Sequence, residues 1–143
     1  MVMDVRMSVI LAVMLFAAPG IAQETAVKEG DPELPPRVVK VSPAHGDKNV
    51  DFNLREISVT FDRPMRTEQS WSWIIHEALG VYPGSRSLPH WSKDAKTCIL
   101  PVRLSPDTLY AVGANSFRHT GFRDKSGKVA VPYVWVFKTG KGK

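Results

Sequence analysis

Apolar and polar side chains alternate along four segments of the chain. A period of two is typical of a β-strand that buries one face. The clearest segment is 56–61, in which Ile57, Val59 and Phe61 fall on one side. The other apolar sets are Cys98, Leu100, Val102 and Leu104 in 97–104, Tyr110, Val112 and Ala114 in 108–115, and Tyr133, Trp135 and Phe137 in 129–139. Each segment therefore predicts a strand with one face in the core. Pro101 falls on the outward set, which favours an edge position or a bulge there.

The remaining chain fits the same architecture. Residues 37–43 form a short β-branched run that stops at Ser-Pro, and 44–49 are rich in turn residues. Residues 71–79 are ambiguous, although Trp71, Trp73 and Ile75 also alternate. No segment after residue 22 keeps a helical period for three turns. Turn signals recur every ~8–15 residues, a spacing that is typical of antiparallel sandwiches. The pattern predicts an all-β fold, an antiparallel β-sandwich of about seven strands.

The N-terminus has the features of a targeting signal. Residues 9–22 are an apolar run of 14 residues, shorter than the ~20 residues that a transmembrane helix needs. Gly20 and Ala22 place small residues where a signal peptidase reads the chain. We therefore expect residues 1–22 to be a signal peptide, cleaved between Ala22 and Gln23, with an uncleaved anchor as the alternative. The mature chain is expected to have no transmembrane span and to be exported, either periplasmic or extracellular.

Composition divides the rest of the chain into three parts. Residues 23–36 are acidic and Pro-rich without an apolar period, which predicts a flexible linker. Residues 37–140 form the expected domain, and 141–143 form a short tail. The chain carries a formal net charge of +5, with 43% hydrophobic and 23% charged residues, which fits one globular domain. The single Cys excludes an intramolecular disulfide and a Cys-based structural zinc site.

Five short motifs follow one another in the order found in a known family. They are Pro43-Ala-His-Gly46 before the strand that ends at Phe61-Asp-Arg-Pro-Met65, Ser92 to Leu100, Leu104-Ser-Pro-Asp-Thr-Leu-Tyr-Ala-Val112, Asp124-Lys-Ser-Gly-Lys128 and Trp135-Val-Phe-Lys-Thr139. Together they resemble the bacterial Ig-like domains of S-layer and other envelope proteins. The resemblance implies an Ig-like β-sandwich, and it implies no catalytic residues. The sequence departs from the family pattern between Trp71 and Trp91, which is rich in aromatic residues.

Three residues are expected to have structural roles. Pro106 fixes φ for a tight turn, and Tyr110 begins the following strand with a hydroxyl that can satisfy a nearby backbone group. This arrangement is typical of the tyrosine corner of Greek-key sandwiches. Trp135 alternates with Phe137, which predicts a core position.

No arrangement of residues predicts catalysis. The segment Pro83-Gly-Ser-Arg-Ser87 lacks the second Gly of a nucleophile elbow. The segment His76-Glu-Ala-Leu-Gly80 has Gly where a zinc-protease helix requires a second His. The four His residues occur singly, and Cys98 falls on an apolar strand face, where it is expected to be an inert core thiol. We therefore expect no enzyme activity, no cofactor and no metal.

Two sets of residues are candidates for binding. Aromatic faces stack on sugar rings, so an aromatic region could bind carbohydrate; it contains Trp71, Trp73, Tyr82, Arg86 and Trp91. A basic loop could bind an anionic surface polymer or a phospholipid headgroup; it contains Arg118, His119, Arg123, Lys125 and Lys128. From residue 37 onward the chain holds 17 Lys and Arg against nine Asp and Glu. Export makes nucleic acid an unexpected partner.

The interpretation that the sequence favours is an exported, non-catalytic Ig-like module for protein–protein interaction or cell-envelope structure. Its partner is expected to be another envelope or secreted protein. A carbohydrate-binding module that uses the region from Trp71 to Trp91 is the alternative.

Overall fold

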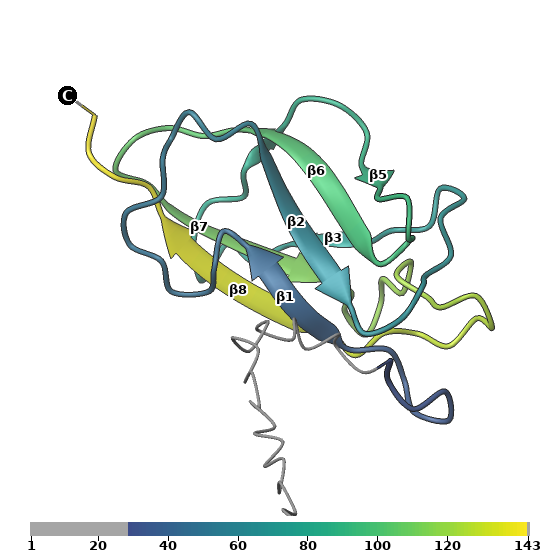
Figure 1. The fold of residues 1–143 in the computed structure, drawn as a ribbon. Coiled ribbons are helices and arrows are strands. Elements are labelled where there is room, and N and C mark those ends of the chain that lie inside the picture. The colour runs from purple at the N-terminus through teal and green to yellow at the C-terminus, as the bar shows by residue number, and fades with distance from the viewer. Residues whose placement is uncertain (1–28, 143) are drawn as a thin grey trace, which may run out of the picture.

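The computed structural model describes residues 29–142, and these contain eight strands in two antiparallel sheets (Figure 1). The strands are β1 (Val38–Ser42), β2 (Glu56–Phe61), β3 (Trp73–Ile75), β4 (Gly84–Ser85), β5 (His90–Trp91), β6 (Thr97–Arg103), β7 (Leu109–Ala114) and β8 (Tyr133–Lys138). One sheet has the order β1-β2-β6-β4 with β5 also beside β6, and the other has the order β3-β7-β8. The prediction of an all-β antiparallel sandwich is confirmed. The expected signal peptide, residues 1–22 with its cleavage site at Ala22 and Gln23, lies outside the described residues.

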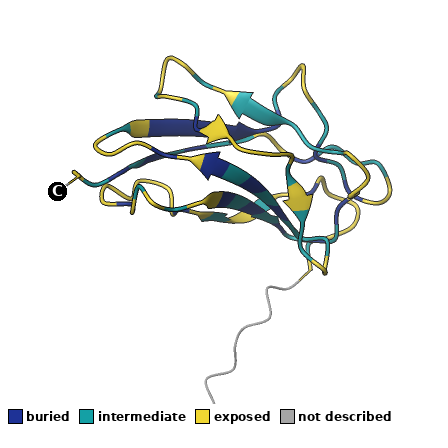
Figure 2. Cartoon of the chain, turned by 90° about the horizontal axis from the view of Figure 1, so that it is seen from above, coloured by how far each residue is buried: buried dark blue, intermediate teal, exposed yellow. Residues whose placement is uncertain are grey.

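The alternating patterns place the core. In β2, every second residue is buried, and Ile57, Val59 and Phe61 are each at most 1% exposed. Strand β6 alternates in the same way, and its partner register pairs Ile57 with Leu100 and Val59 with Cys98. Residues directly opposite on neighbouring strands share a face, so these side chains form one apolar surface. The buried residues lie in the middle of the strands, and the exposed residues lie mostly in the loops at the two ends of the sandwich (Figure 2).

Pro101 lies in β6, an interior strand, and not at a sheet edge. It faces Glu56 of β2 in the register, but its carbonyl accepts a hydrogen bond from Arg86 N at 2.9 Å on the opposite side. The imide nitrogen therefore also points to that side, where β4 ends at Ser85 and β5 begins at His90. Pro101 has no N–H to donate, but it faces the gap between β4 and β5, where no strand needs that donor. The hydrogen bonds between β6 and β2 are therefore unaffected.

The tyrosine corner joins the two ends of the connection between β6 and β7. The Tyr110 hydroxyl accepts a hydrogen bond from Ser105 N at 2.7 Å, and the Tyr110 side chain is 3% exposed. Thr139 Oγ1 accepts from Thr108 N at 2.9 Å and donates to Ser105 O at 2.6 Å. Pro106 is exposed at the turn, and its carbonyl accepts from Thr108 Oγ1. These contacts fix where β7 starts, which matters because its first residues line the site described below.

The segment 45–50 covers the outer edge of β8. Gly46 N donates to Val136 O at 2.8 Å, Lys138 N donates to Asp47 O at 2.7 Å, and Val50 N donates to Lys138 O at 3.0 Å. The His45 side chain also accepts from Val136 N through Nδ1 at 3.1 Å. The outward backbone groups of Val136 and Lys138 are therefore satisfied, and the C-terminal half of this edge is covered.

Residues 29–36, which the composition assigns to a linker, lie against the sandwich. Arg63 is 7% exposed and holds this segment through its guanidinium, which donates to Asp31 O at 2.9 Å and to Leu34 O at 2.8 Å. The same guanidinium pairs with Asp62 at 3.1 Å and with Asp124 at 3.3 Å. Pro36 is buried as well. Residues 23–28 lie outside the description, and of the expected tail only 141 and 142 fall within it, where both are exposed.

Candidate functional site

The aromatic region splits between core and surface. Trp73 packs against Phe122 with ring centroids 5.7 Å apart, and Trp91 packs against the same ring at 5.9 Å in an edge-on arrangement. Trp73 also lies 6.0 Å from Trp135, which is fully buried. The indole N–H groups of Trp73 and Trp91 are buried and have no acceptor within residues 29–142. Both rings therefore pack against the core, and each stays partly exposed.

Trp71 and Tyr82 are also partly exposed, and they share a cavity of about 330 Å³ with Trp73. The cavity opens between β3 and the segment that carries β4, with Ser85, Pro89 and His119 at its rim. Burial raises the pKa of the Tyr82 hydroxyl. Arg86 lies in a separate hollow with Gly84, Ser85 and Arg103. Of the five proposed carbohydrate-binding residues, the structure therefore brings Trp71, Trp73 and Tyr82 together.

The basic loop is also divided. Arg123 turns back to Thr120, donating to its carbonyl and its hydroxyl at 2.8 Å each, and Lys128 donates to Pro32 O. The His119 ring contacts Ser116 Oγ at 3.3 Å. Arg118 and Lys125 are exposed, and neither side chain has a partner within residues 29–142. Two of the five basic side chains thus stabilise the local fold, and Arg118 and Lys125 are free to meet a partner.

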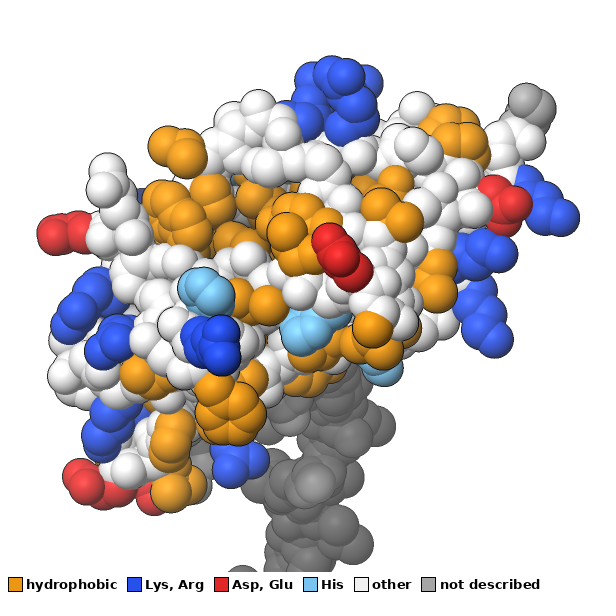
Figure 3. Space-filling model, turned by 180° about the vertical axis from the view of Figure 1, so that it is seen from behind, with side chains coloured by type: hydrophobic (Ala, Val, Ile, Leu, Met, Phe, Trp, Pro, Cys, Tyr) orange, Lys and Arg blue, Asp and Glu red, His pale blue; other side chains and the backbone are white. Residues whose placement is uncertain are grey.

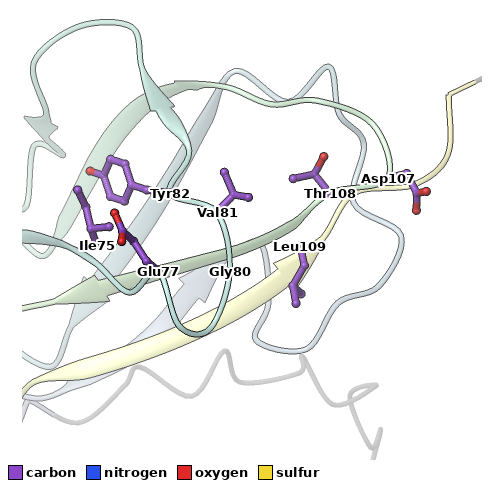
Figure 4. Close-up of a pocket in the computed structure, with 8 residues that line it drawn as sticks. All are labelled: Ile75, Glu77, Gly80, Val81, Tyr82, Asp107, Thr108 and Leu109. Atoms are coloured by element: carbon purple, nitrogen blue, oxygen red, sulfur yellow. The ribbon is translucent and has the colours of Figure 1, made fainter.

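A third surface was not identified from the sequence. It is a groove of about 680 Å³ at the end of β3, here called the β3 groove, and it is lined by Ile75, Glu77, Gly80, Val81, Tyr82, Asp107, Thr108 and Leu109 (Figure 4). Ile75, Glu77 and Tyr82 lie together at one end of it, and Thr108 and Asp107 lie at the other. Ile75 is 55% exposed, Val81 54% and Leu109 46%. Apolar side chains spread over this face with an acidic side chain among them (Figure 3).

The charge of the β3 groove is opposite to that of the domain. Its charged residues are Glu77 and Asp107, and Asp107 Oδ1 lies 3.2 Å from Lys138 Nζ. Glu77 has no ion-pair partner within residues 29–142. The groove therefore combines exposed aliphatic surface with one uncompensated carboxylate, in a domain that is otherwise basic.

The groove adjoins a strand edge whose backbone is free. Asn115 N donates to Ser72 O at 3.0 Å, and Ile74 faces Gly113 in the register. Backbone groups of successive residues point to opposite sides, so Ser72 and Ile74 face β7, whereas Trp73 and Ile75 direct their N–H and C=O groups outward. Val81 occupies the next position along β7, where its backbone bonds Leu109 O and Ala111 N. Neither Trp73 nor Ile75 has a backbone partner on the outer side among the described residues.

Cys98 has no access to solvent. It is 0% exposed on the core face of β6, and burial raises the pKa of its thiol to about 12. Because the thiolate is the reactive form, we expect iodoacetamide near pH 8 to leave Cys98 unmodified in the folded protein and to alkylate it completely in concentrated urea. Mass spectrometry measures both. Rapid alkylation without urea would show that this strand opens readily.

The described residues contain no group of three or more His, Cys, Asp or Glu side chains placed to hold a metal ion. Within residues 29–142 there is also no helix of the length and hydropathy that crossing a bilayer requires.

The two antiparallel sheets and the tyrosine corner define a sandwich of the Ig-like class. The chain belongs to the bacterial Ig-like domain family, whose sequence model matches residues 32–139. This confirms the family resemblance stated from the motifs, and the match begins within the segment that Arg63 holds. Domains of this family are generally non-catalytic.

Two solved structures are similar in fold. One is surface layer protein SbsC, domains 1–6, with 17% identity and a TM-score of 0.45. The other is a crystal structure of the S-layer protein rSbsC, with 17% identity and a TM-score of 0.43. Each similarity covers 77% of this chain and 14% of that chain. A comparison with curated protein sequences found no match.

Proposed function

We propose that this protein is an exported, non-catalytic Ig-like module that binds another polypeptide chain of the cell envelope or its surroundings, through the β3 groove and the free edge of β3. The N-terminal signal pattern supports export to the periplasm or beyond, and family membership supports an interaction or structural role. The observation that carries the proposal is the exposed apolar groove beside unpaired strand backbone.

The shape and chemistry of the surface favour a polypeptide as its ligand. Sites for small molecules are usually enclosed and carry several convergent polar groups. The β3 groove is instead broad and aliphatic, and Glu77 is its uncompensated charge. Clustered aliphatic side chains on a surface are typical of protein-binding sites. A free strand edge beside them can bind an extended segment through main-chain hydrogen bonds.

The carbohydrate alternative has less support. Stacking on a sugar needs an aromatic face in solvent, whereas Trp73 and Trp91 are partly buried and each packs against Phe122 in an edge arrangement. Trp71 and Tyr82 remain, in a cavity of about 330 Å³ that Pro89 and Ser85 border. The exposed aliphatic residues of the β3 groove offer more surface to a protein than these two rings offer to a glycan.

Site-specific photocrosslinking in intact cells tests the proposal. p-Benzoylphenylalanine in place of Val81, which is 54% exposed in the β3 groove, is expected to yield protein adducts of the mature chain without residues 1–22. The matched control is the same residue in place of Leu88, which is 73% exposed and outside the groove. Adducts at position 81 that are absent at position 88 support the proposal. No adducts at 81, or equal adducts at both positions, would overturn it.

A further inference from the structure

The two ends of β3 carry complementary surfaces. At its C-terminal end lies the β3 groove, with exposed Ile75 and Val81 and the unpaired carboxylate of Glu77. At its N-terminal end lies the turn 116–119, because Ser72 is bonded to Asn115. This turn carries Phe117, which is fully exposed at 102%, and the cationic side chain of Arg118. One end therefore has an apolar groove with a negative charge, and the other has an apolar knob with a positive charge.

We propose that the groove and edge of β3 are occupied by a second copy of this chain, paired antiparallel through β3 about a two-fold axis at Ile74. The proposal rests on the proposed function and names its partner. The β3-β7-β8 sheets of the two copies then form one continuous sheet. Each copy presents the same surface to the other, as a two-fold contact requires.

The register follows from the outward backbone groups. Trp73 and Ile75 are the β3 residues whose N–H and C=O groups point away from β7. With the axis at Ile74, Trp73 of each copy faces Ile75 of the other. In an antiparallel pair, such residues exchange both of their N–H···O=C hydrogen bonds. If the register between the two copies shifted by one residue, Ile74 would lie opposite a residue whose N–H and C=O groups point outward. Ile74 could not bond to these groups, because its own backbone groups face Gly113 of β7.

The charges select the antiparallel arrangement. It brings the C-terminal end of each β3 beside the N-terminal end of the other, so Glu77 of one copy approaches Arg118 and His119 of the second. The exposed ring of Phe117 approaches the β3 groove of the second copy. A parallel arrangement would place Glu77 beside Glu77 and Arg118 beside Arg118, and like charges in contact oppose association. The contact is thus self-complementary in one orientation.

The mass of the mature protein as a function of concentration, measured by light scattering after size exclusion, gives the first test. We expect a monomer–dimer equilibrium. Ile75→Pro removes an outward N–H that β7 does not use, so it is expected to raise the dimer dissociation constant by more than tenfold while the fold is kept. Ile75→Lys is expected to act in the same direction. Leu88→Lys, the control, is expected to leave association unchanged.

Two further experiments test the orientation. Ile74 would face its own copy across the axis, so Ile74→Cys is expected to form a disulfide-linked dimer on mild oxidation. Glu77→Arg and Arg118→Glu are each expected to weaken association, and the variant that carries both is expected to restore it. Because both side chains are exposed, circular dichroism should show an intact fold in all three proteins.

A wild-type protein that stays monomeric up to about 1 mM would overturn the dimer proposal. Dimers that Ile75→Pro and Ile75→Lys leave unchanged would also overturn it. If the crosslinks at position 81 then contain a different protein, the proposed function stands and only the partner is wrong. If position 81 yields no specific crosslink either, both proposals fail.

Discussion

Replacing Asn115 with alanine is expected to lower the free energy of unfolding by ~3–5 kcal/mol. The side chain is 1% exposed, and its amide donates to Phe122 O at 2.9 Å and to Ala130 O at 3.1 Å while its oxygen accepts from Phe122 N at 2.9 Å. Alanine leaves Phe122 N and Ala130 O unpaired, at ~1–3 kcal/mol for each group, whereas Phe122 O keeps its bond from Ala130 N at 2.9 Å. The residue also has a φ of 62°, a region that alanine tolerates poorly.

Two control variants separate these effects in urea unfolding experiments. Asn115→Gly accepts the positive φ but loses the same hydrogen bonds, so most of the destabilisation is expected to remain. The difference between Asn115→Ala and Asn115→Gly therefore measures the backbone effect. Gln69→Ala is the control for shortening a side chain at a positive φ without buried hydrogen bonds, because Gln69 has a φ of 48° on an exposed loop. It is expected to cost ~1 kcal/mol or less. Equal losses in Asn115→Ala and Gln69→Ala would show that the amide hydrogen bonds contribute little.

Replacing Arg63 with methionine is expected to cost ~3–5 kcal/mol, since it leaves buried carboxylates without their partner. Asp62 and Asp124 have side-chain exposures of 11% and 7%, and both lie within 3.3 Å of the guanidinium. The variant also loses the bonds that hold residues 31–34. Arg66→Met, at an exposed position three residues away, is the control and is expected to change stability by less than ~0.5 kcal/mol.

The pH dependence of unfolding provides a second measurement on the same variant. Burial acts to raise the pKa of Asp124, but hydrogen bonds from Ser126 and Lys128, together with Arg63, outweigh it and lower the pKa. A carboxyl group whose pKa is lower in the native state than in the unfolded state stabilises the fold at pH values above the unfolded-state pKa. This stabilisation is lost as the pH falls through the native-state pKa. We therefore expect wild-type stability to decline below about pH 4, and to decline less steeply in Arg63→Met. Equal slopes would indicate that Asp124 does not depend on Arg63.

The strands predicted from sequence are those long enough to show a period. β2, β6, β7 and β8 each have six or seven residues, and alternation marks them because one face meets the opposite sheet. β4 and β5 have two residues each, which is too short for any period. The packing of residues 29–36 could not be predicted either, because it depends on Arg63, which contacts Asp31 and Leu34 across 32 and 29 positions of sequence. Composition alone describes that segment as a linker.

The candidate site was only partly predictable. The sequence identified the aromatic residues around Trp71 but did not indicate which of them would pack against the core. That choice depends on Phe122, which reaches the core from a long connection and contacts both Trp73 and Trp91. The β3 groove left a faint signal, since Leu109 is apolar on the polar side of its strand's alternation. Whether β3 lies at an edge follows from strand order, which local patterns do not contain.

The segment that covers β8 limits how far any assembly through this sheet can grow. Gly46, Asp47 and Val50 use the outer backbone groups of Val136 and Lys138, so the C-terminal half of β8 has none to offer a further strand. A strand that pairs along the full length of a sheet edge can therefore be added on the β3 side alone, and such addition stops after one event. As the protein concentration rises, the average molecular mass is expected to reach the mass of a dimer and to stay there, without a lag phase and without fibres. The covered half of β8 thus limits assembly through this sheet to a dimer, and it protects the domain from unlimited strand addition.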